Sequence, residues 1–329
     1  MLGREDLKSA TEVKKNPRAC PVLGCKTVVA GMTRGILGSL DGQLSKGLTR
    51  EKEFEQYLCK EHGIYVTPTT FVYKDMWDNL LWDEAAERNL LAKVLTSKRM
   101  KAQLHHENSE DAVTWNVFRF LERSGLLGRF LTQLRGAPVT DPEVMYWTHS
   151  RSEGNGWSEV QAARQEFGER AQWASEPDLI IRSDETVFVV EAKLGANSKP
   201  RTKYTSKEKA ERAGRYGKGQ RYLRQSVGDI MDAGYFQLMR FWLLGCWIAE
   251  QTEREFMLVN LVRSGKEEGI EESFGRCVRG NRHRRFLRVT WEDIYEFIAE
   301  AAPASAERDR IMRYFQNRTV YCRKVFGVP

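Results

Sequence analysis

Two short apolar segments rich in β-branched residues lie near the middle of the chain, on either side of a polar pair. The segments are residues 179–181 and 187–190, and the polar pair is Asp184-Glu185. This pattern predicts a β-hairpin, although the pair is neither Asn-Gly nor Asp-Gly and leaves the turn type open. In a hairpin, the numbers of two residues that lie opposite each other always add up to the same total. If the turn is at residues 184 and 185, this total is 369, which is also the sum of 178 and 191. Asp178 is therefore expected to lie directly opposite Glu191.

The predicted hairpin gathers charged side chains on one face. Side chains alternate along a strand, so Lys193 shares a face with Glu191. Opposed carboxylates repel each other unless a cation neutralises them. Mg²⁺ takes carboxylate oxygens and keeps several waters, which makes it the metal expected here, with Mn²⁺ as its substitute.

A known signature covers the same residues. Pro177-Asp178 followed by Glu191-Ala192-Lys193 resembles the motif of the PD-(D/E)xK nuclease superfamily, which has the restriction-endonuclease-like fold. The resemblance implies that Asp178 and Glu191 hold Mg²⁺ and that Lys193 positions or activates the attacking water. It also implies hydrolysis of nucleic acid, with DNA favoured over RNA, in genome defence or DNA processing.

A helix is predicted before the hairpin in the sequence, with Asn108 as its N-cap. Asp111, three residues later, is the expected partner of Asn108 in an arrangement like a capping box. The apolar face of this helix is marked at helical spacing by Val113, Val117 and Leu121. Glu110 falls on that face, and the resemblance implies a glutamate from such a helix as the third acidic residue. The alternative is that Glu110 only complements the helix dipole, and Glu107 is the second candidate for the metal.

A second element of the resemblance lies near residue 237. The segment from Tyr235 to Phe241 is similar to the Gln-x-x-x-Tyr element of the RecB-type subgroup, with Gln237 as the glutamine. Phe241 stands where a tyrosine is usual, so the hydroxyl is missing and the subgroup stays open. A plain core helix that carries one amide is the alternative.

The N-terminal region carries a separate set of metal-ligating residues. Cys20 and Cys25 form a C-x4-C pair around Gly24, and Cys59 and His62 form a C-x2-H pair. Three cysteines and one histidine are a known ligand set for structural Zn²⁺. The alternative is a pair of buried thiols with two incidental residues.

Positive charge is concentrated in one segment. The chain has a net charge of +7, and residues 199–224 contain ten Lys or Arg against two Glu. Such a segment suits a nucleic-acid backbone, and its interleaved tyrosines, Tyr204, Tyr216 and Tyr222, suit base stacking. The candidate nucleic-acid-binding residues are Lys199, Arg201, Lys203, Lys207, Arg212, Arg215, Lys218 and Arg221. A second basic cluster at residues 276–288 is expected to form a loop before a strand.

The remaining patterns predict an α/β protein. Helices are expected at residues 109–122, 125–134, 158–167, 227–250, 305–317 and from Trp291 onward, and strands at 143–148, 255–262 and 286–290. Helices around strands predict a central mixed sheet. We expect three parts: an N-terminal region (1–104) with the zinc candidate, a restriction-endonuclease-like core (105–300) and a helical extension (301–329).

Composition sets the remaining expectations. The chain is 41% hydrophobic and 29% charged, begins without a secretory pattern and has no apolar stretch of membrane-spanning length, so we expect a cytoplasmic protein with no membrane partner. Oligomerisation and a protein partner stay open. Two alternatives to an enzyme also stay open: a nucleic-acid-binding protein without catalysis and a scaffold with the same fold.

Overall fold

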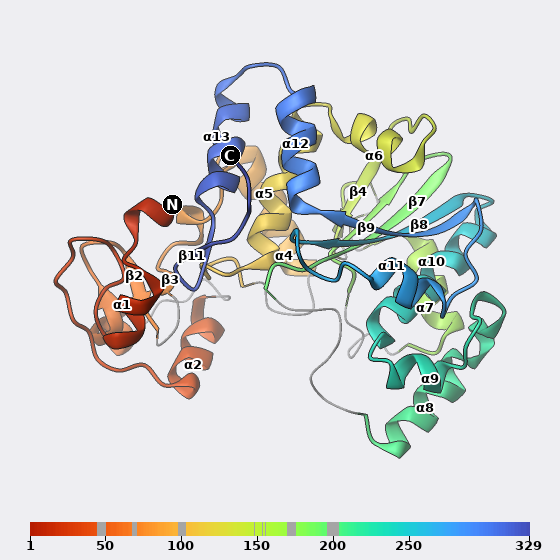
Figure 1. Cartoon of the computed structure of the whole chain (residues 1–329), viewed down its shortest axis with the longest axis horizontal. Helices are drawn as coiled ribbons and strands as arrows, with labels where there is room; N and C mark the ends of the chain where they lie inside the picture. Colours follow the sequence, from red (N-terminus) through yellow and green to blue (C-terminus); the bar gives the residue numbers. More distant parts are fainter. Residues whose placement is uncertain are drawn as a thin grey trace. The chain divides into compact units, whose positions relative to one another are not determined.

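The computed structural model describes residues 1–44, 51–67, 71–97, 103–147, 149–152, 154, 156–169, 176–195 and 204–329 (Figure 1). The chain divides into two compact units. The first comprises Met1–Leu95, Lys101–Ser124 and Glu292–Pro329, and the second comprises Thr96–Met100 and Gly125–Trp291. Because the chain leaves the first unit and returns to it, the units do not follow the divisions expected at residues 104 and 300. The three-part division into domains stays a prediction.

The second unit is built on a six-stranded sheet with the order β5-β4-β6-β7-β8-β9. The pairs from β5 to β7 are antiparallel and the pairs from β7 to β9 are parallel, so the sheet is mixed, and the chain is α/β as predicted. The strands are β4 (Glu143–Tyr146), β5 (His149–Ser150), β6 (Leu179–Arg182), β7 (Thr186–Ala192), β8 (Glu255–Val262) and β9 (Arg284–Thr290). The helices are α6 (Leu127–Arg135), α7 (Ser158–Glu166), α8 (Ser206–Tyr216), α9 (Val227–Asp232), α10 (Phe236–Gln251) and α11 (Ile270–Gly275).

The hairpin of β6 and β7 has the predicted register. Leu179 pairs with Val190, and the pairing continues to Arg182 and Val187. The turn falls at Asp184 and Glu185, where the Ser183 backbone N–H donates to the Thr186 carbonyl at 2.9 Å. The Ser183 hydroxyl also donates to the Glu185 carboxylate at 2.7 Å, which supplies the turn with the local hydrogen bonding that Ser and Asp residues favour.

One face of this sheet packs against α7 and α10. Ile180, Val189 and Leu258 belong to a single buried cluster together with most of α10. Twelve of the sixteen residues of α10 are buried and most of these are apolar, as expected for a helix packed in a core. α6 lies on the opposite side of the sheet from α10 (Figure 1).

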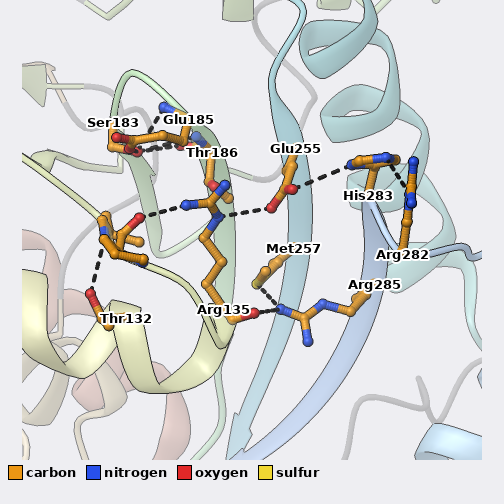
Figure 2. A network of polar contacts seen from close by, with 12 residues as sticks. Thr132, Arg135, Ser183, Glu185, Thr186, Glu255, Met257, Arg282, His283 and Arg285 are labelled. Carbon is orange, nitrogen blue, oxygen red and sulfur yellow. Dashed lines mark hydrogen bonds and ion pairs between the residues drawn. The ribbon is translucent and has the colours of Figure 1, made fainter.

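The amino ends of the parallel strands are joined to α6 by a polar network, which Figure 2 shows. Glu255, the first residue of β8, accepts from Arg135 Nε at 2.8 Å and contacts His283 Nδ1 at 3.3 Å. Hydrogen bonding to Arg135 holds the pKa of Glu255 below its ordinary value. Arg285 donates to the carbonyls of Leu134 and Arg135, at the end of α6. These contacts lie at the amino ends of β8 and β9, which is the end of the sheet away from the carboxyl ends of β7, β8 and β9.

Two helix predictions are wrong in detail. The single helix expected over 227–250 is broken into α9 and α10 because Gly234 adopts a left-handed conformation with φ +84°. The helix expected from Asn108 begins one residue later: Ser109 is the N-cap and accepts from the Ala112 backbone N–H at 3.0 Å. Asp111 accepts from the Gln103 backbone N–H instead of completing a capping box.

Gly245 brings α10 close to β8. An added Cβ would lie 2.0 Å from the ring of Phe256, which is buried in the core. Gly245→Ala is therefore expected to destabilise the protein by about 1–3 kcal/mol through overpacking, although alanine is intrinsically the better helix former. Urea denaturation measures the effect.

Gly214→Ala in α8 is the matched control, because a Cβ there would meet nothing within 4 Å. We expect this variant to be neutral or to gain up to about 1 kcal/mol. A Gly245→Ala protein as stable as wild type would contradict the close approach.

The first unit contains a small antiparallel sheet with the order β1-β2-β3 and a second pair, β10-β11. The strands are β1 (Leu58–Cys59), β2 (Ile64–Val66), β3 (Phe71–Tyr73), β10 (Thr319–Val320) and β11 (Arg323–Lys324). The helices are α1 (Ala10–Lys15), α2 (Arg34–Leu44), α3 (Glu51–Phe54), α4 (Ala85–Ser97), α5 (Glu110–Arg123), α12 (Trp291–Ala301) and α13 (Ala306–Asn317). α4 and α12 each extend past the division into units. Across the described residues, every helix is too short or too polar to cross a membrane.

Candidate functional site

The apolar face under α10 becomes polar at the carboxyl end of β7. Val187 and Val189 lie in the core on this face, and Glu191 is the next residue on it. The parallel register pairs Glu191 with Asn260 of β8. Polar side chains from two neighbouring parallel strands therefore lie side by side at the edge of the sheet where α/β proteins commonly bind ligands.

Glu191 is held in place by two donors. Its side chain is only 2% exposed, and its Oε1 accepts from Gln237 Nε2 at 2.6 Å. The Lys193 ammonium forms an ion pair with the same oxygen. A buried carboxylate is costly unless it is paired and hydrogen-bonded, and these two contacts supply that compensation.

Asp178 immediately precedes β6, one residue before the first pair of the register. It has the strand parity of Ile180 and therefore projects from the same face as Glu191. Its Oδ2 accepts from the Ala192 backbone N–H at 2.8 Å, and its carbonyl accepts from the Trp147 N–H at 3.0 Å. The sequence-predicted arrangement of Asp178 against the end of β7 is thus present.

The backbone of Lys193 is fixed on both sides. Its N–H donates to the Leu261 carbonyl at 2.7 Å, and its carbonyl accepts from Trp291 Nε1 at 3.2 Å. The path of β7 therefore continues past its last paired residue. This continuation keeps Lys193 on the face of Glu191.

Gln237 reaches this group from the first turn of α10. The helix begins after Tyr235, so that Gln237 points to Glu191 while Phe241, one turn later, is fully buried in the core. The structure therefore brings Gln237 to the two hairpin residues Glu191 and Lys193.

Asn260 and Glu267 form a polar pair near this group that was not predicted from the sequence. Asn260 is fully buried, and its Nδ2 donates to the Glu267 carboxylate at 2.7 Å. The sequence does indicate Asn260 as unusual. Phe256, Leu258 and Asn260 share one face of an apolar strand, and a buried amide on that face needs a hydrogen-bond partner. Glu267 itself has φ +52°, a conformation uncommon outside glycine.

The proposed third acidic residue belongs to the other unit. Glu110 begins α5 in the first unit, whereas Asp178 and Glu191 lie in the second. Within the described part of the second unit, no group of three Asp, Glu, His or Cys brings its ligand atoms within 4.8 Å of one another. Glu110 as a metal ligand therefore stays a prediction. Glu107, the second candidate, is buried and accepts from the Cys322 backbone N–H at 2.7 Å.

The N-terminal cysteines and the histidine do come together. The ligand atoms of Cys20, Cys25, Cys59 and His62 all lie within 4.8 Å of one another. Burial raises the pKa of the Cys20 thiol far above its ordinary value. Burial also acts to raise the pKa of Cys25, but hydrogen bonding to Thr27, Cys20 and Cys59 together outweighs it and lowers that pKa.

The basic segment is described only in part. Lys199, Arg201 and Lys203 lie outside the described residues. The others lie on or directly after α8, where Arg212 stacks on the rings of Tyr204 and Phe236 at 4.6 and 4.4 Å. Three more form ion pairs: Arg215 with Glu211, Lys218 with Glu166 and Arg221 with Glu250. Lys207 is exposed on α8.

The prediction that all three tyrosines of this segment are available for base stacking is wrong. Tyr216 and Tyr222 are buried in the core cluster beneath α8 and α10. Their hydroxyls contact Glu169 and Glu250, and aromatic rings with such anchored hydroxyls serve packing. Tyr204 is half-buried and packs edge-on against Phe236.

In comparisons with known proteins, no protein-family model, no curated protein and no solved structure matches this chain.

Proposed function

We propose that this chain is a metal-dependent nuclease that hydrolyses phosphodiester bonds, with DNA as the favoured substrate. The observation that carries the proposal is the register of β6 and β7, in which Asp178 meets the end of β7 beside Glu191 and Lys193. Two carboxylates and an ammonium lie at the carboxyl end of β7, where the parallel strands of the mixed sheet end and where α/β proteins commonly bind ligands. The mixed sheet flanked by helices supports a restriction-endonuclease-like fold.

The donor set suits Mg²⁺ or Mn²⁺. Asp178 and Glu191 offer hard carboxylate oxygens, and the Asn260 carboxamide is the register partner of Glu191. When bound, the metal would supply Lewis-acid stabilisation of the phosphate and activation of the attacking water. Asp178 and Glu191 would hold it.

The remaining residues would act on charge and orientation. The Lys193 ammonium, paired with Glu191, would stabilise negative charge on the reacting phosphate and orient the water. Gln237 would position Glu191 through its 2.6 Å hydrogen bond rather than contact the substrate.

A cleavage assay on the full chain tests the function. Single- and double-stranded DNA and RNA of one sequence are incubated with the protein in Mg²⁺, in Mn²⁺ and in EDTA. We expect cleavage with either metal and none in EDTA, with activity restored by excess Mg²⁺. Binding without cleavage under every condition would favour the non-catalytic nucleic-acid-binding protein, and neither binding nor cleavage would favour the scaffold.

Binding of nucleic acid is expected to weaken steeply with salt. Lys207, Lys218 and Arg221 are the exposed cations to change, since the side chains of Lys218 and Arg221 are 63% and 59% exposed. Each phosphate contact contributes a slope of about 0.7–0.9 in log K against log salt. Replacing all three with Gln should reduce the slope by up to about 2–3, measured by fluorescence anisotropy.

A charge-matched control separates contact from net charge. Lys52, Arg313 and Arg323 are exposed cations of the first unit, and their triple Gln variant loses the same charge. We expect it to retain the wild-type slope. Equal slopes in all three proteins would move the binding surface away from α8.

A further inference from the structure

Four ligand atoms from two segments far apart in sequence converge in the first unit. Cys25 Sγ lies 3.9 Å from Cys59 Sγ, although the two residues are 34 positions apart. His62 Nδ1 lies 3.7 Å from Cys20 Sγ and 3.4 Å from Cys59 Sγ. Each of the two short motifs therefore contributes to one common point.

Three of the six separations between these ligand atoms match the edges of a zinc tetrahedron. With Zn–S near 2.3 Å and Zn–N near 2.0–2.1 Å, tetrahedral geometry requires about 3.8 Å between sulfurs and about 3.5 Å between sulfur and nitrogen. The three distances of 3.4–3.9 Å bracket these values, and all four ligand atoms lie within 4.8 Å of one another. A tetrahedral set of three sulfurs and one nitrogen is characteristic of Zn²⁺.

The backbone around the first pair is shaped as a tight turn. Gly24 has φ +78°, which a residue with a side chain rarely adopts, and the Cys25 N–H donates to the Val22 carbonyl at 3.2 Å. Lys8 Nζ donates to the carbonyls of both Cys20 and Cys25 at 2.7 Å. Three thiolates around one Zn²⁺ leave a net negative charge, and the Lys8 ammonium is placed to offset it.

Cys322 is a buried cysteine of the first unit that lies outside the Cys/His set, and it serves as a comparison. Cys322 is buried in the same small apolar cluster as Cys20, Cys25 and Cys59. It is not part of the convergent set. Burial in this core is therefore not enough to bring a cysteine into the set. His62 is a polar side chain beside the three thiols, which indicates a metal-binding site and not apolar packing.

We propose that Cys20, Cys25, Cys59 and His62 bind one structural Zn²⁺. All four positions are filled by protein side chains, which is the arrangement of a structural rather than a catalytic zinc site. Binding displaces the three thiol protons and ties the turn at Gly24 to β1. The metal would therefore hold together the N-terminal part of the first unit, independently of the proposed chemistry at Glu191.

The test uses the full chain purified without chelator. Elemental analysis should find about one zinc per chain, and exchange with Co²⁺ should give the intense visible spectrum of tetrahedral cobalt with thiolate ligands. Zinc removal should make the N-terminal region of the first unit sensitive to protease. Iron in place of zinc, a Cys25–Cys59 disulfide, or an octahedral cobalt spectrum would each overturn the proposal.

Variants identify the ligands. Cys59→Ser and His62→Ala should each lower zinc affinity by more than about 100-fold in a competition assay with a chromogenic chelator, a larger loss than outer-shell changes cause. Cys322→Ala should keep full zinc content, because it changes a buried cysteine of the same cluster outside the ligand set. Glu61→Gln should also keep it, although Glu61 accepts from the Cys25 thiol at 3.4 Å. Full zinc in Cys59→Ser, or loss in Cys322→Ala alone, would reject this site.

Discussion

Asp178→Asn, Glu191→Gln and Lys193→Met are each expected to reduce nucleic-acid cleavage by roughly 10²-fold or more. The changes keep side-chain size and remove charge. Asp178→Asn keeps an oxygen that can accept from the Ala192 N–H, so folding should be preserved. Initial rates at saturating Mg²⁺ and circular dichroism of the same samples separate lost chemistry from lost structure.

The hairpin itself provides the control. Asp184 lies at the turn, at the far end of the same two strands, and is exposed. Asp184→Asn makes the identical chemical change and should cleave at the wild-type rate. Wild-type rates in any two of the three site variants would remove the assignment of the active site.

Gln237 tests the same arrangement through another readout. Gln237→Met removes the donor to Glu191 while keeping the size of the side chain. Because it acts by orienting a metal-binding carboxylate, the change should raise the Mg²⁺ concentration needed for half-maximal cleavage about 10–100-fold. A lower rate at every Mg²⁺ concentration with an unchanged requirement would instead indicate a general effect on packing.

Glu169→Gln is expected to destabilise the second unit by about 3–5 kcal/mol. The side chains of Glu169 and Arg240 are 1% and 3% exposed and form a bidentate pair, with distances of 2.5 and 2.7 Å. The Tyr216 hydroxyl donates to the same carboxylate at 2.7 Å. Neutralising Glu169 would leave the Arg240 guanidinium buried without its counter-charge, which is the costly outcome for a buried ion pair.

The pH dependence of this effect follows from the direction of the pKa shift. Burial acts to raise the pKa of Glu169, but the hydrogen bonds and charge of Arg240, with the Tyr216 hydrogen bond and the charge of Arg164, outweigh it and hold the pKa below its ordinary value. A carboxyl whose pKa is lowered on folding stabilises the protein above its unfolded pKa of about 4.3 and loses that contribution as the pH falls through the folded pKa. The difference between wild type and Glu169→Gln should therefore be full at neutral pH and shrink below about pH 4.

Two comparisons make the stability test specific. Replacing both partners, Glu169→Leu with Arg240→Met, should recover much of the loss, since apolar residues can replace a buried pair. Glu166→Gln removes the exposed partner of Lys218, 3.8 Å away, and should change stability by less than about 1 kcal/mol. Denaturant unfolding that ranks Glu166→Gln with Glu169→Gln would contradict the role of burial.

Local pattern alone determined several parts of this protein. The register of the hairpin followed from two apolar segments and one polar pair, because strand pairing has a period of two and a short turn leaves little freedom. The eight residues of β8 also follow directly from an apolar run of strand length. The spacing of the two N-terminal motifs indicated the Cys/His set for a related reason: short loops bring neighbouring ligands together.

Other features were decided by residues distant in sequence. Arg240 is conspicuous in the apolar helix α10, but its partner Glu169 is 71 positions away and no local rule connects them. The burial of Tyr216 and Tyr222 likewise depends on how α8 and the following turn pack on α10, while composition alone suggested exposed rings in a basic segment.

The division of the chain has the same origin. α5 and the C-terminal segment belong with the N-terminal region because the apolar faces of helices are buried against whichever partner the fold supplies, wherever that partner lies in the chain. Pattern therefore determined strands, turns and ligand spacing, which depend on a few consecutive residues. Tertiary packing decided which buried charges pair, which aromatic rings are covered and which segments share a core, since each of these requires contacts across long stretches of chain.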